Sequence, residues 1–147
     1  MLARSCAFLT PPKAILVPGI AAGAWLHPYE YVYYNALVGW TGGIERQYEN
    51  DYWFTSACEA ARYLDTVAGD GARVGVTADI VKTLFLRCAD KKFEVVIERV
   101  AESQINADYS VIPTRYDDDL DYYRKMNVVM VIGRGKTEFT VIKKAAP

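Results

Sequence analysis

The sequence predicts an α/β fold: a small three-layer sandwich with a mostly parallel sheet and a C-terminal antiparallel hairpin. Two observations predict this fold. Helix-patterned and strand-patterned segments alternate in the C-terminal two thirds of the chain, and two β-branched runs near its end flank a glycine-rich turn. An apolar segment and an aromatic segment precede this region. We therefore expect an apolar membrane-associated or docking segment (1–26), an aromatic linker (27–54) and a small α/β domain (55–147).

The first helix of the domain is expected to begin at Ser56. Ser56 and Glu59 have the spacing of a capping box, in which the serine oxygen accepts from a helix amide and the glutamate reaches back. Alanine and leucine recur at helical spacing up to Ala68, and glycines then end the helix. A short buried strand (73–77) and a second helix follow. The apolar face of that second helix consists of Ile80, Val81, Leu84, Phe85 and Cys88.

Two further strands are expected at 93–98 and 109–112, because β-branched residues dominate both runs and Pro113 ends the second. The acidic run from Asp117 to Asp121 is expected to open a short helix, since carboxylates are favoured at the positive end of a helix dipole. The run lacks the alternating ligands of a calcium-binding loop. We therefore interpret it as a solvated helix start, with an opportunistic cation site as the alternative.

The last two strands are expected at 128–132 and 138–142, on either side of a turn that contains Gly133 and Gly135. These glycines precede a strand rather than a helix, so they do not form a dinucleotide-binding fingerprint. The complete order is α-β-α-β-β-α-β-β. Strands separated by helices predict parallel neighbours with right-handed crossovers.

Composition and charge exclude several functions. The chain has 147 residues, of which 52% are hydrophobic and 24% are charged, as in an ordered domain with one core. Its 17 Lys and Arg residues face 18 Asp and Glu residues, so no excess positive charge is available to bind nucleic acid. The single histidine excludes multi-histidine metal sites. We expect no cofactor, no metal ion and no nucleic-acid partner.

The three cysteines, Cys6, Cys58 and Cys88, are widely spaced and odd in number. Neither a zinc site nor a disulfide framework follows from that spacing. Cys58 and Cys88 lie within or beside the apolar stripes of the two expected helices. We therefore interpret both as small buried hydrophobic residues rather than nucleophiles.

The N-terminal segment is apolar and carries no acid before Glu30. Its uncharged stretch from Ala14 to Leu26 is shorter than the about 20 residues of a membrane-spanning helix, and Pro18 and Gly19 interrupt it. Three interpretations stay open: a trimmed or re-entrant membrane segment, an interfacial anchor, and a buried element of a soluble core. Trp25, followed by a tyrosine cluster, favours a membrane–water boundary, where amphipathic rings settle.

A first aromatic block follows this segment. Tyr29, Tyr31 and Tyr33 alternate, which in an extended chain places three phenols on one face. Such a face suits lipid headgroups, sugar rings or a partner surface. The alternative is a strand that packs on its own domain with its hydroxyl groups satisfied.

A second block mixes two carboxylates with three aromatic rings directly before the first helix of the domain: Tyr48, Glu49, Asp51, Tyr52 and Trp53. This mixture is typical of the wall of a carbohydrate or polar-headgroup site, and it is also common where a helix begins. No second group of opposite role is evident, so Glu49 and Asp51 do not define a general acid and base.

The two blocks together resemble the C-terminal region of bacterial lipid-carrier-dependent membrane glycosyltransferases of the protein-mannosyltransferase type. The resemblance is strong over residues 27–64. It rests on His27-Pro28-Tyr29-Glu30-Tyr31-Val32-Tyr33-Tyr34-Asn35-Ala36-Leu37-Val38-Gly39, on Gly42-Gly43, and on Tyr48-Glu49-x-Asp51-Tyr52-Trp53-x-x-Ser56-x-x-Glu59-Ala60. The family commonly has glycine where this chain has Trp40 and Phe54. In such enzymes a bundle of transmembrane helices carries catalysis, and a small extracytoplasmic α/β domain follows its last helix.

The resemblance implies that the membrane-spanning catalytic bundle has no counterpart in this chain, so no catalytic residue carries over. It implies a location on the extracytoplasmic, periplasmic side of a membrane. Docking onto the membrane or an integral membrane protein is expected at Trp25, His27, Tyr29, Tyr31, Tyr33, Tyr34, Asn35 and Trp40. Contact with a polar group, or with a lipid-linked sugar, is expected at Tyr48, Glu49, Asp51, Tyr52 and Trp53.

The function expected from these features is that of a non-catalytic extracytoplasmic domain, or a homologue of one, of a lipid-linked-sugar glycosyltransferase. Alone, such a chain is expected to be inactive. The alternative is a free-standing structural subunit of a larger membrane complex, docked through residues 1–35. A third hypothesis is a soluble module that binds a small ligand with its aromatic segment.

Overall fold

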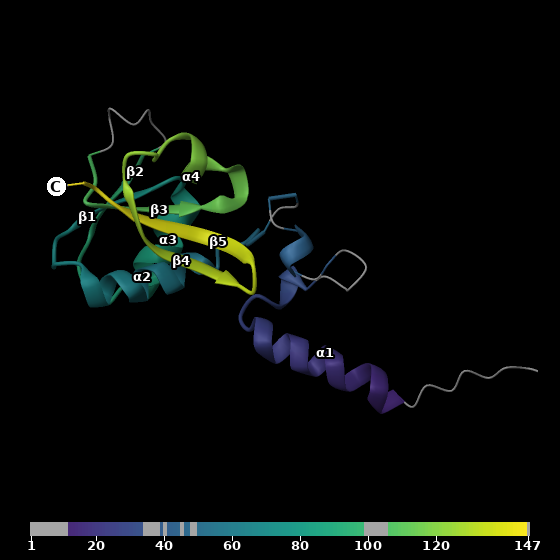
Figure 1. Cartoon of the computed structure of the whole chain (residues 1–147). Helices are drawn as coiled ribbons and strands as arrows, with labels where there is room; N and C mark the ends of the chain where they lie inside the picture. The colour runs from purple at the N-terminus through teal and green to yellow at the C-terminus, as the bar shows by residue number, and fades with distance from the viewer. Residues whose placement is uncertain are drawn as a thin grey trace, which may run out of the picture. The chain divides into compact units, whose positions relative to one another are not determined.

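The computed structural model describes residues 12–33, 39, 41–44, 46–47, 50–98 and 106–146. They belong to two compact units, Met1–Tyr33 and Tyr34–Pro147 (Figure 1). The first unit contains helix α1 (Pro12–Leu26) and a single 3₁₀ turn, η1 (Glu30–Val32).

The second unit is the α/β domain, and all five expected strands and all three expected helices are present in it. Its helices are α2 (Ser56–Val67), α3 (Asp79–Cys88) and α4 (Asp118–Asp121), with 3₁₀ turns η3 (Thr41–Ile44) and η5 (Thr114–Tyr116). Its strands are β1 (Arg73–Val76), β2 (Glu94–Ile97), β3 (Tyr109–Pro113), β4 (Asn127–Arg134) and β5 (Thr137–Lys144).

The five strands form one mixed sheet in the order β2-β1-β3-β5-β4 (Figure 1). The central strand β1 pairs in parallel with β2 on one side and with β3 on the other. Strand β5 is antiparallel to β3 and forms the C-terminal hairpin with β4. Gly135 turns this hairpin with a φ of 65°, a conformation that favours glycine. The α/β fold class and the hairpin are confirmed.

Helices α2 and α3 cover one face of the sheet and α4 covers the other. The hydroxyl groups of Ser56 in α2 and Thr140 in β5 are 2.6 Å apart. Lys143 of β5 instead donates to the carbonyl oxygens of Asp119, at 2.6 Å, and Tyr123, at 3.0 Å. Thr140 and Lys143 lie an odd number of residues apart on one strand, so they point to opposite faces. The sheet is therefore the middle of three layers.

The hydrophobic core lies between the sheet and the helix pair α2 and α3. Its fully buried members include Leu64 of α2, Phe85 of α3 and Val74, Val76 and Val111 of the parallel strands. Burying one such side chain stabilises a fold by roughly 1.5–3 kcal/mol. Leu64 and Phe85 are among the residues that helical periodicity placed on apolar faces, and Val74 and Val76 belong to the strand that was expected to be buried.

A disulfide joins α2 to α3, and here the sequence-based interpretation is wrong. Cys58 and Cys88 are bonded, with their Cα atoms 5.1 Å apart. The two helices pack side by side, which brings together two cysteines that are 30 residues apart in the sequence. They are a cross-link between two core helices rather than two independent buried thiols.

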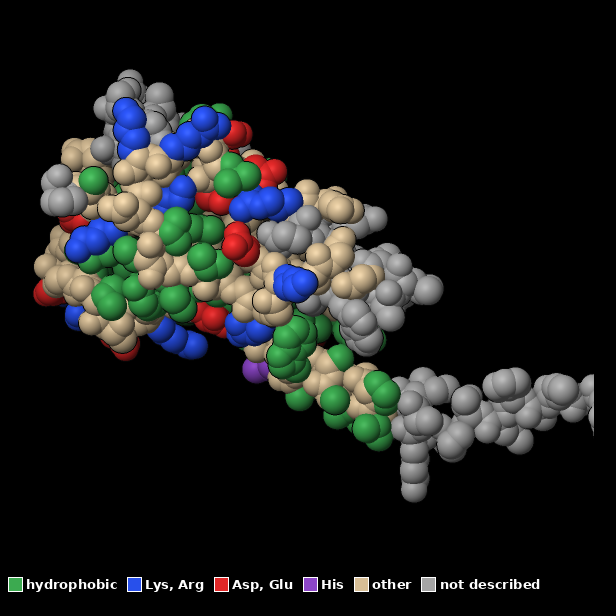
Figure 2. Space-filling view, in the orientation of Figure 1, with side chains coloured by type: hydrophobic (Ala, Val, Ile, Leu, Met, Phe, Trp, Pro, Cys, Tyr) green, Lys and Arg blue, Asp and Glu red, His purple; other side chains and the backbone are tan. Residues whose placement is uncertain are grey.

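Strand β4 is an edge of the sheet and carries exposed apolar side chains. Val128, Met130 and Val131 have exposed fractions of 56%, 38% and 41%. Hydrophobic side chains gather over this part of the domain in Figure 2. The pairing of β4 with β5 shifts register between Val128 and Met130 and again between Ile132 and Gly133. Such bulges are a common way to discourage pairing of an edge strand with another chain.

Most of the described part of the first unit is helical. Pro18 lies inside α1, which continues through Gly19, so the expected interruption at these two residues does not occur. Val17, Ile20 and Trp25 are more than half exposed. Among the described residues, no helix combines the length and the apolar character needed to cross a membrane.

The extended conformation expected for the first aromatic block is wrong. Tyr29 precedes η1, and Tyr31 and Val32 lie within it. Because a 3₁₀ turn has three residues per turn, alternation along the sequence does not place side chains on a common face. Tyr29 and Val32 are buried, whereas Tyr31 and Tyr33 are exposed.

Candidate functional site

A tight turn, from Asp51 to Phe54, leads into α2 and shapes the candidate site. Asp51 and Phe54 have positive φ angles of 47° and 54°, a region that residues other than glycine rarely adopt. Strained positions of this kind are concentrated at functional sites. The turn buries Asp51 and leaves Tyr52 and Trp53 exposed.

Asp51 holds the beginning of α2 in place of the expected capping box. Its carboxylate accepts hydrogen bonds from the backbone amides of Thr55, at 2.7 Å, and Ser56, at 3.0 Å, and from the Ser56 hydroxyl. Thr55 is the N-cap residue and makes no side-chain capping bond. Glu59 pairs instead with Arg134 of β4 at 2.7 Å. The capping box of Ser56 and Glu59 is therefore wrong, because a buried carboxylate already satisfies the free amides.

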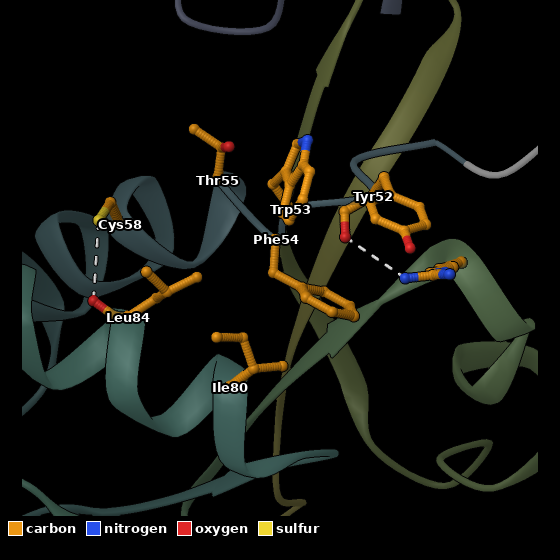
Figure 3. Close-up of a pocket in the computed structure, with 8 residues that line it drawn as sticks. Tyr52, Trp53, Phe54, Thr55, Cys58, Ile80 and Leu84 are labelled. Carbon is orange, nitrogen blue, oxygen red and sulfur yellow. Dashed lines mark hydrogen bonds between the residues drawn. The ribbon is translucent and has the colours of Figure 1, made fainter. Parts of the chain in front are cut away.

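A groove of about 550 Å³ opens beside this turn (Figure 3). Its walls come from the turn, the first residues of α2, the helix α3 and the turn η5. The lining consists of Tyr52, Trp53, Phe54, Thr55, Cys58, Ile80, Leu84 and Arg115. Ile80 and Leu84 lie one helical turn apart and present one apolar face of α3 to the groove. Its size falls in the usual range of small-molecule sites, about 300–1,000 Å³.

Arg115 is the charged residue among the described residues that line the groove. Its guanidinium lies 4.3 Å from the ring centre of Tyr52, 5.0 Å from that of Tyr116 and 5.7 Å from that of Phe54. It also donates a hydrogen bond to the Tyr52 carbonyl oxygen at 3.3 Å (Figure 3). Cation–π contacts of this kind attract a guanidinium to the faces of aromatic rings, and they fix the position of the charge.

The groove lies at the carboxyl ends of the parallel strands β1 and β3. Strand β1 is followed by α3, which contributes Ile80, and β3 is followed directly by η5, which contributes Arg115. The chain leaves β1 towards α3 on one face of the sheet and leaves β3 towards α4 on the other. Open α/β sheets characteristically bind ligands at such a point, where connections from neighbouring strands diverge.

The structure brings together two of the five residues expected to contact a polar group or sugar. Tyr52 and Trp53 both line the groove, with their ring centres 5.0 Å apart and nearly perpendicular. Asp51 points inward and caps α2, so it does not face the groove. Tyr48 and Glu49 lie outside the described residues.

The residues expected to dock on a membrane or partner are in mixed environments. Trp25, Tyr31 and Tyr33 are exposed, whereas Tyr29 is buried. His27 is exposed, and its Nδ1 lies 2.6 Å from the Glu30 carboxylate. A hydrogen bond with its own backbone, and the one with His27, lower the pKa of Glu30. The remaining expected residues, Tyr34, Asn35 and Trp40, lie outside the described part of the chain.

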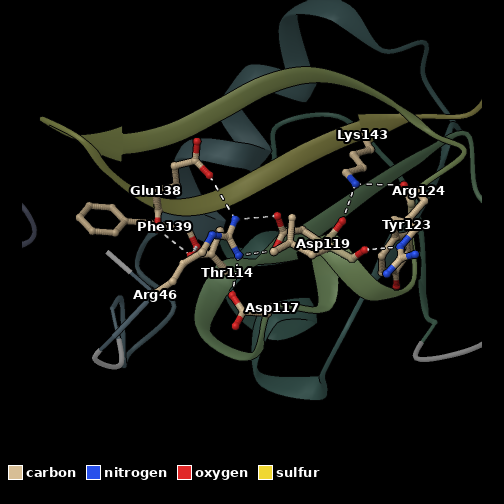
Figure 4. Close-up of polar contacts among 10 residues, drawn as sticks. Arg46, Thr114, Asp117, Asp119, Tyr123, Arg124, Glu138, Phe139 and Lys143 are labelled. Atoms are coloured by element: carbon tan, nitrogen blue, oxygen red, sulfur yellow. Dashed lines mark hydrogen bonds and ion pairs between the residues drawn. The ribbon is translucent and has the colours of Figure 1, made fainter. Parts of the chain in front are cut away.

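A second polar cluster surrounds Arg46 (Figure 4). Its guanidinium contacts the carboxylates of Asp119 at 2.9 Å, Asp117 at 2.5 Å and Glu138 at 3.3 Å. Hydrogen bonds to Asp119, and then to Asp117, raise the pKa of Arg46 further above its ordinary range against the opposing effect of burial. The guanidinium therefore stays charged at every accessible pH.

The Arg46 cluster corrects the interpretation of the acidic run. The run does open a short helix, as expected, but Asp118 and Asp119 are 4% exposed rather than solvated. Arg46 supplies the positive charge that a buried carboxylate needs. Its contacts also fasten the segment before α2 to α4 and β5.

Binding is the chemistry that the groove supports. The groups that line it in the described structure are aromatic and aliphatic side chains, the hydroxyls of Tyr52 and Thr55, one disulfide sulfur and one guanidinium, and they include no pair of nucleophile and base. No group of three or more His, Cys, Asp or Glu side chains within the described ranges is placed to hold a metal ion.

Sequence reasoning missed Arg115, Ile80 and Leu84 as groove residues. The available signal was their position after two parallel strands, but reading it requires the strand order. Comparison with known proteins does not identify the site either: no family model, no curated protein and no solved structure matches the chain.

Proposed function

We propose that this chain is a non-catalytic extracytoplasmic domain, or a homologue of one, of a lipid-linked-sugar membrane glycosyltransferase. The observation that carries the proposal is that one chain contains both a helix with exposed apolar side chains, α1, and an α/β domain with a disulfide. In α1, Val17, Ile20 and Trp25 are exposed by 63%, 63% and 55%. Large apolar side chains gathered on one short helix need a cover, which a bilayer or a neighbouring membrane helix provides.

The disulfide between Cys58 and Cys88 supports the extracytoplasmic side of the membrane. Disulfides persist in the bacterial periplasm and at cell surfaces, and they are rare in the reducing cytosol.

The backbone of Phe54 supports the resemblance of the second aromatic block. The glycosyltransferases that this block resembles commonly have glycine at this position, and Phe54 here has a φ of 54°, in the region that glycine adopts without strain. A side chain is retained there because Phe54 is 8% exposed and belongs to the core. The conformation of the turn thus matches the residue usual in the family even though the residue itself differs.

The division of labour follows from what the described residues lack. The described lining of the groove offers binding groups and no pair of nucleophile and base, and the resemblance implies that a membrane bundle supplies the catalytic carboxylate of such an enzyme. The domain would then help to shape the site next to the bilayer. Tyr52 and Trp53 are the exposed rings best placed to contact a sugar or headgroup.

Membrane binding of the full chain tests the proposal. Wild type is incubated with vesicles of phosphatidylethanolamine and phosphatidylglycerol and centrifuged, beside the variant V17S/I20S/W25S. We expect wild type in the pellet and the variant in the supernatant. The control V67S/L86S removes two exposed apolar side chains of α2 and α3 and should pellet like wild type.

Two results would contradict the proposal. One is wild type that remains in the supernatant with vesicles and with isolated bacterial membranes alike. The other is glycosyl transfer from a lipid-linked sugar by this chain alone, which would place catalysis within it.

The exposed side chains of α1 also favour the second function, a structural subunit of a membrane complex. In that case α1 packs on helices of a partner, and the chain binds isolated membranes but not protein-free vesicles. Chemical cross-linking in membranes would then join the chain to one integral protein at a fixed ratio.

A further inference from the structure

We propose that the disulfide between Cys58 and Cys88 is a site of thiol–disulfide exchange with a partner dithiol. The partner's thiolate enters the groove at the carboxyl ends of β1 and β3 and attacks the sulfur of Cys58. The inference does not rest on the glycosyltransferase proposal, because it uses only residues of the α/β domain.

Cys58 forms part of the groove wall. It lines the groove together with Thr55, at the beginning of α2, and Leu84 of α3 (Figure 3). The Cys58 Sγ atom lies 3.7 Å from the Leu84 carbonyl oxygen. Cys88, which the structure also describes, is not one of the lining residues. A thiolate that enters the groove therefore meets the Cys58 end of the disulfide.

The exposure of this disulfide distinguishes it from a cross-link that is sealed in a core. Cys58 and Cys88 are both partly exposed. Exchange requires a thiolate to approach one of the two sulfur atoms, so its rate depends on access, and exposed disulfides are typical of labile, regulatory and catalytic pairs. The groove, at about 550 Å³, has the size of a small-molecule site, so a thiol can enter it.

The proposed reaction transfers two electrons from the dithiol to the disulfide. One thiolate of the partner attacks Cys58 Sγ, a bond forms between these two sulfur atoms, and the bond to Cys88 breaks. Cys88 leaves as a thiolate. The partner's second thiolate then attacks the partner's own sulfur in this mixed disulfide, so that Cys58 leaves as a thiolate and the partner keeps a disulfide. The two protons that the dithiol loses are balanced by the two that the cysteines take up.

Trapping of the mixed disulfide tests where the exchange begins. The folded full chain is mixed with the monothiol mercaptoethanol, quenched with N-ethylmaleimide, digested and analysed by mass spectrometry. We expect mercaptoethanol on Cys58 and maleimide on Cys88, in about tenfold or greater excess over the reverse pattern. With the dithiol dithiothreitol, both cysteines should carry maleimide, because its second thiol releases Cys58. The variant C6A should give the same two patterns.

Two tryptophan substitutions on α3 test the route through the groove. Ile80 and Leu86 are similarly exposed, by 49% and 44%, but Ile80 lines the groove, whereas Leu86 is not among its described lining residues. I80W should slow the reaction with mercaptoethanol about fivefold or more, because the larger side chain narrows access to Cys58. L86W is the matched control and should react at the wild-type rate. A variant that only destabilised the fold would react faster, so slowing reports access.

The dependence of the rate on urea separates exchange in the folded chain from exchange after unfolding. Attack through the groove needs no unfolding, so the rate should change little at urea concentrations well below the unfolding midpoint. A reaction that proceeds through the unfolded chain would accelerate steeply with urea, because urea raises the unfolded fraction.

Several outcomes would overturn the proposal. They are mercaptoethanol on Cys88 as often as on Cys58 or more often, an equal rate in I80W and wild type, equal slowing in I80W and L86W, and a rate that rises steeply at low urea. A disulfide that stays intact in the folded chain after prolonged incubation with either thiol would also overturn it.

Discussion

The carboxylate of Asp51 accepts hydrogen bonds from both the backbone amide and the hydroxyl group of Ser56, at the first residue of α2. The same hydroxyl lies 2.6 Å from that of Thr140 in β5. The buried side chain of Ser56, at the beginning of α2, thus connects Asp51 in the turn that carries Tyr52 and Trp53 to Thr140 in the sheet.

Replacing Asp51 tests this connection. In D51A two amides and one hydroxyl lose their acceptor, so the free energy of unfolding should fall by about 1–3 kcal/mol in a urea titration. D51N keeps one carbonyl oxygen and tolerates a positive φ, so it should lose less. Equal stability of D51A and wild type would contradict the assigned role.

Glu59 should stabilise the fold through its ion pair with Arg134 rather than by capping the amides at the beginning of α2. A double-mutant cycle of E59Q and R134Q should give a coupling energy of about 0.2–1 kcal/mol, typical of a pair that water still reaches. If Glu59 capped α2 instead, the E59Q loss would persist unchanged in the R134Q background.

The disulfide should be present in protein from an oxidising compartment. Alkylation of the denatured, unreduced chain should modify one of the three cysteines, Cys6, whereas prior reduction should expose all three. The variant C58A/C88A should lose about 2–4 kcal/mol of unfolding free energy, with C6A as the matched control. Three alkylated cysteines without reduction would refute the cross-link.

Removal of Arg46 should leave the buried Asp119 without its main counter-charge. R46Q should lower the free energy of unfolding by about 1–3 kcal/mol, and R46K should recover only part of the loss because lysine lacks the planar fork. Equal stability of R46Q and wild type would contradict the assigned contacts.

The loss of unfolding free energy in R46Q should depend on pH in a way that follows from the raised pKa of Arg46. Because the pKa of Arg46 is higher in the folded state than in the unfolded state, the stability that its ion pairs contribute is complete below the unfolded-state pKa of arginine. That contribution is lost only as the pH rises from there through the folded-state pKa. The difference in urea midpoint between wild type and R46Q should therefore stay constant from neutral to moderately alkaline pH. A steady decline across that range would argue against a charge-based role.

Most of the α/β domain follows from local signals. The periodicity of Leu64, Val81 and Phe85 placed two helices, and β-branched runs placed five strands, because these patterns depend on near neighbours. The Asp51 cap was missed because it depends on two positive φ angles that sequence propensities do not register. The disulfide was missed because the packing of α2 on α3 brings Cys58 to Cys88.

The groove was less accessible to sequence reasoning than the fold. Tyr52 and Trp53 were expected to contact a polar group or a lipid-linked sugar, since carboxylates mixed with aromatic rings are typical of such a site. Arg115 could not be grouped with them, because the order β2-β1-β3 brings it there and no short motif encodes that order. The extended form expected around Tyr31 failed for a related reason, since alternation cannot distinguish a strand from a 3₁₀ turn over so few residues.

Fluorescence of Trp25 tests the central claim, that the exposed apolar side chains of α1 bind a membrane, most directly. In the single-tryptophan variant W40F/W53F, vesicles with brominated acyl chains should quench the emission and shift it to shorter wavelength. Unchanged emission, from a chain that stays in the supernatant of vesicles and isolated membranes, would contradict the claim.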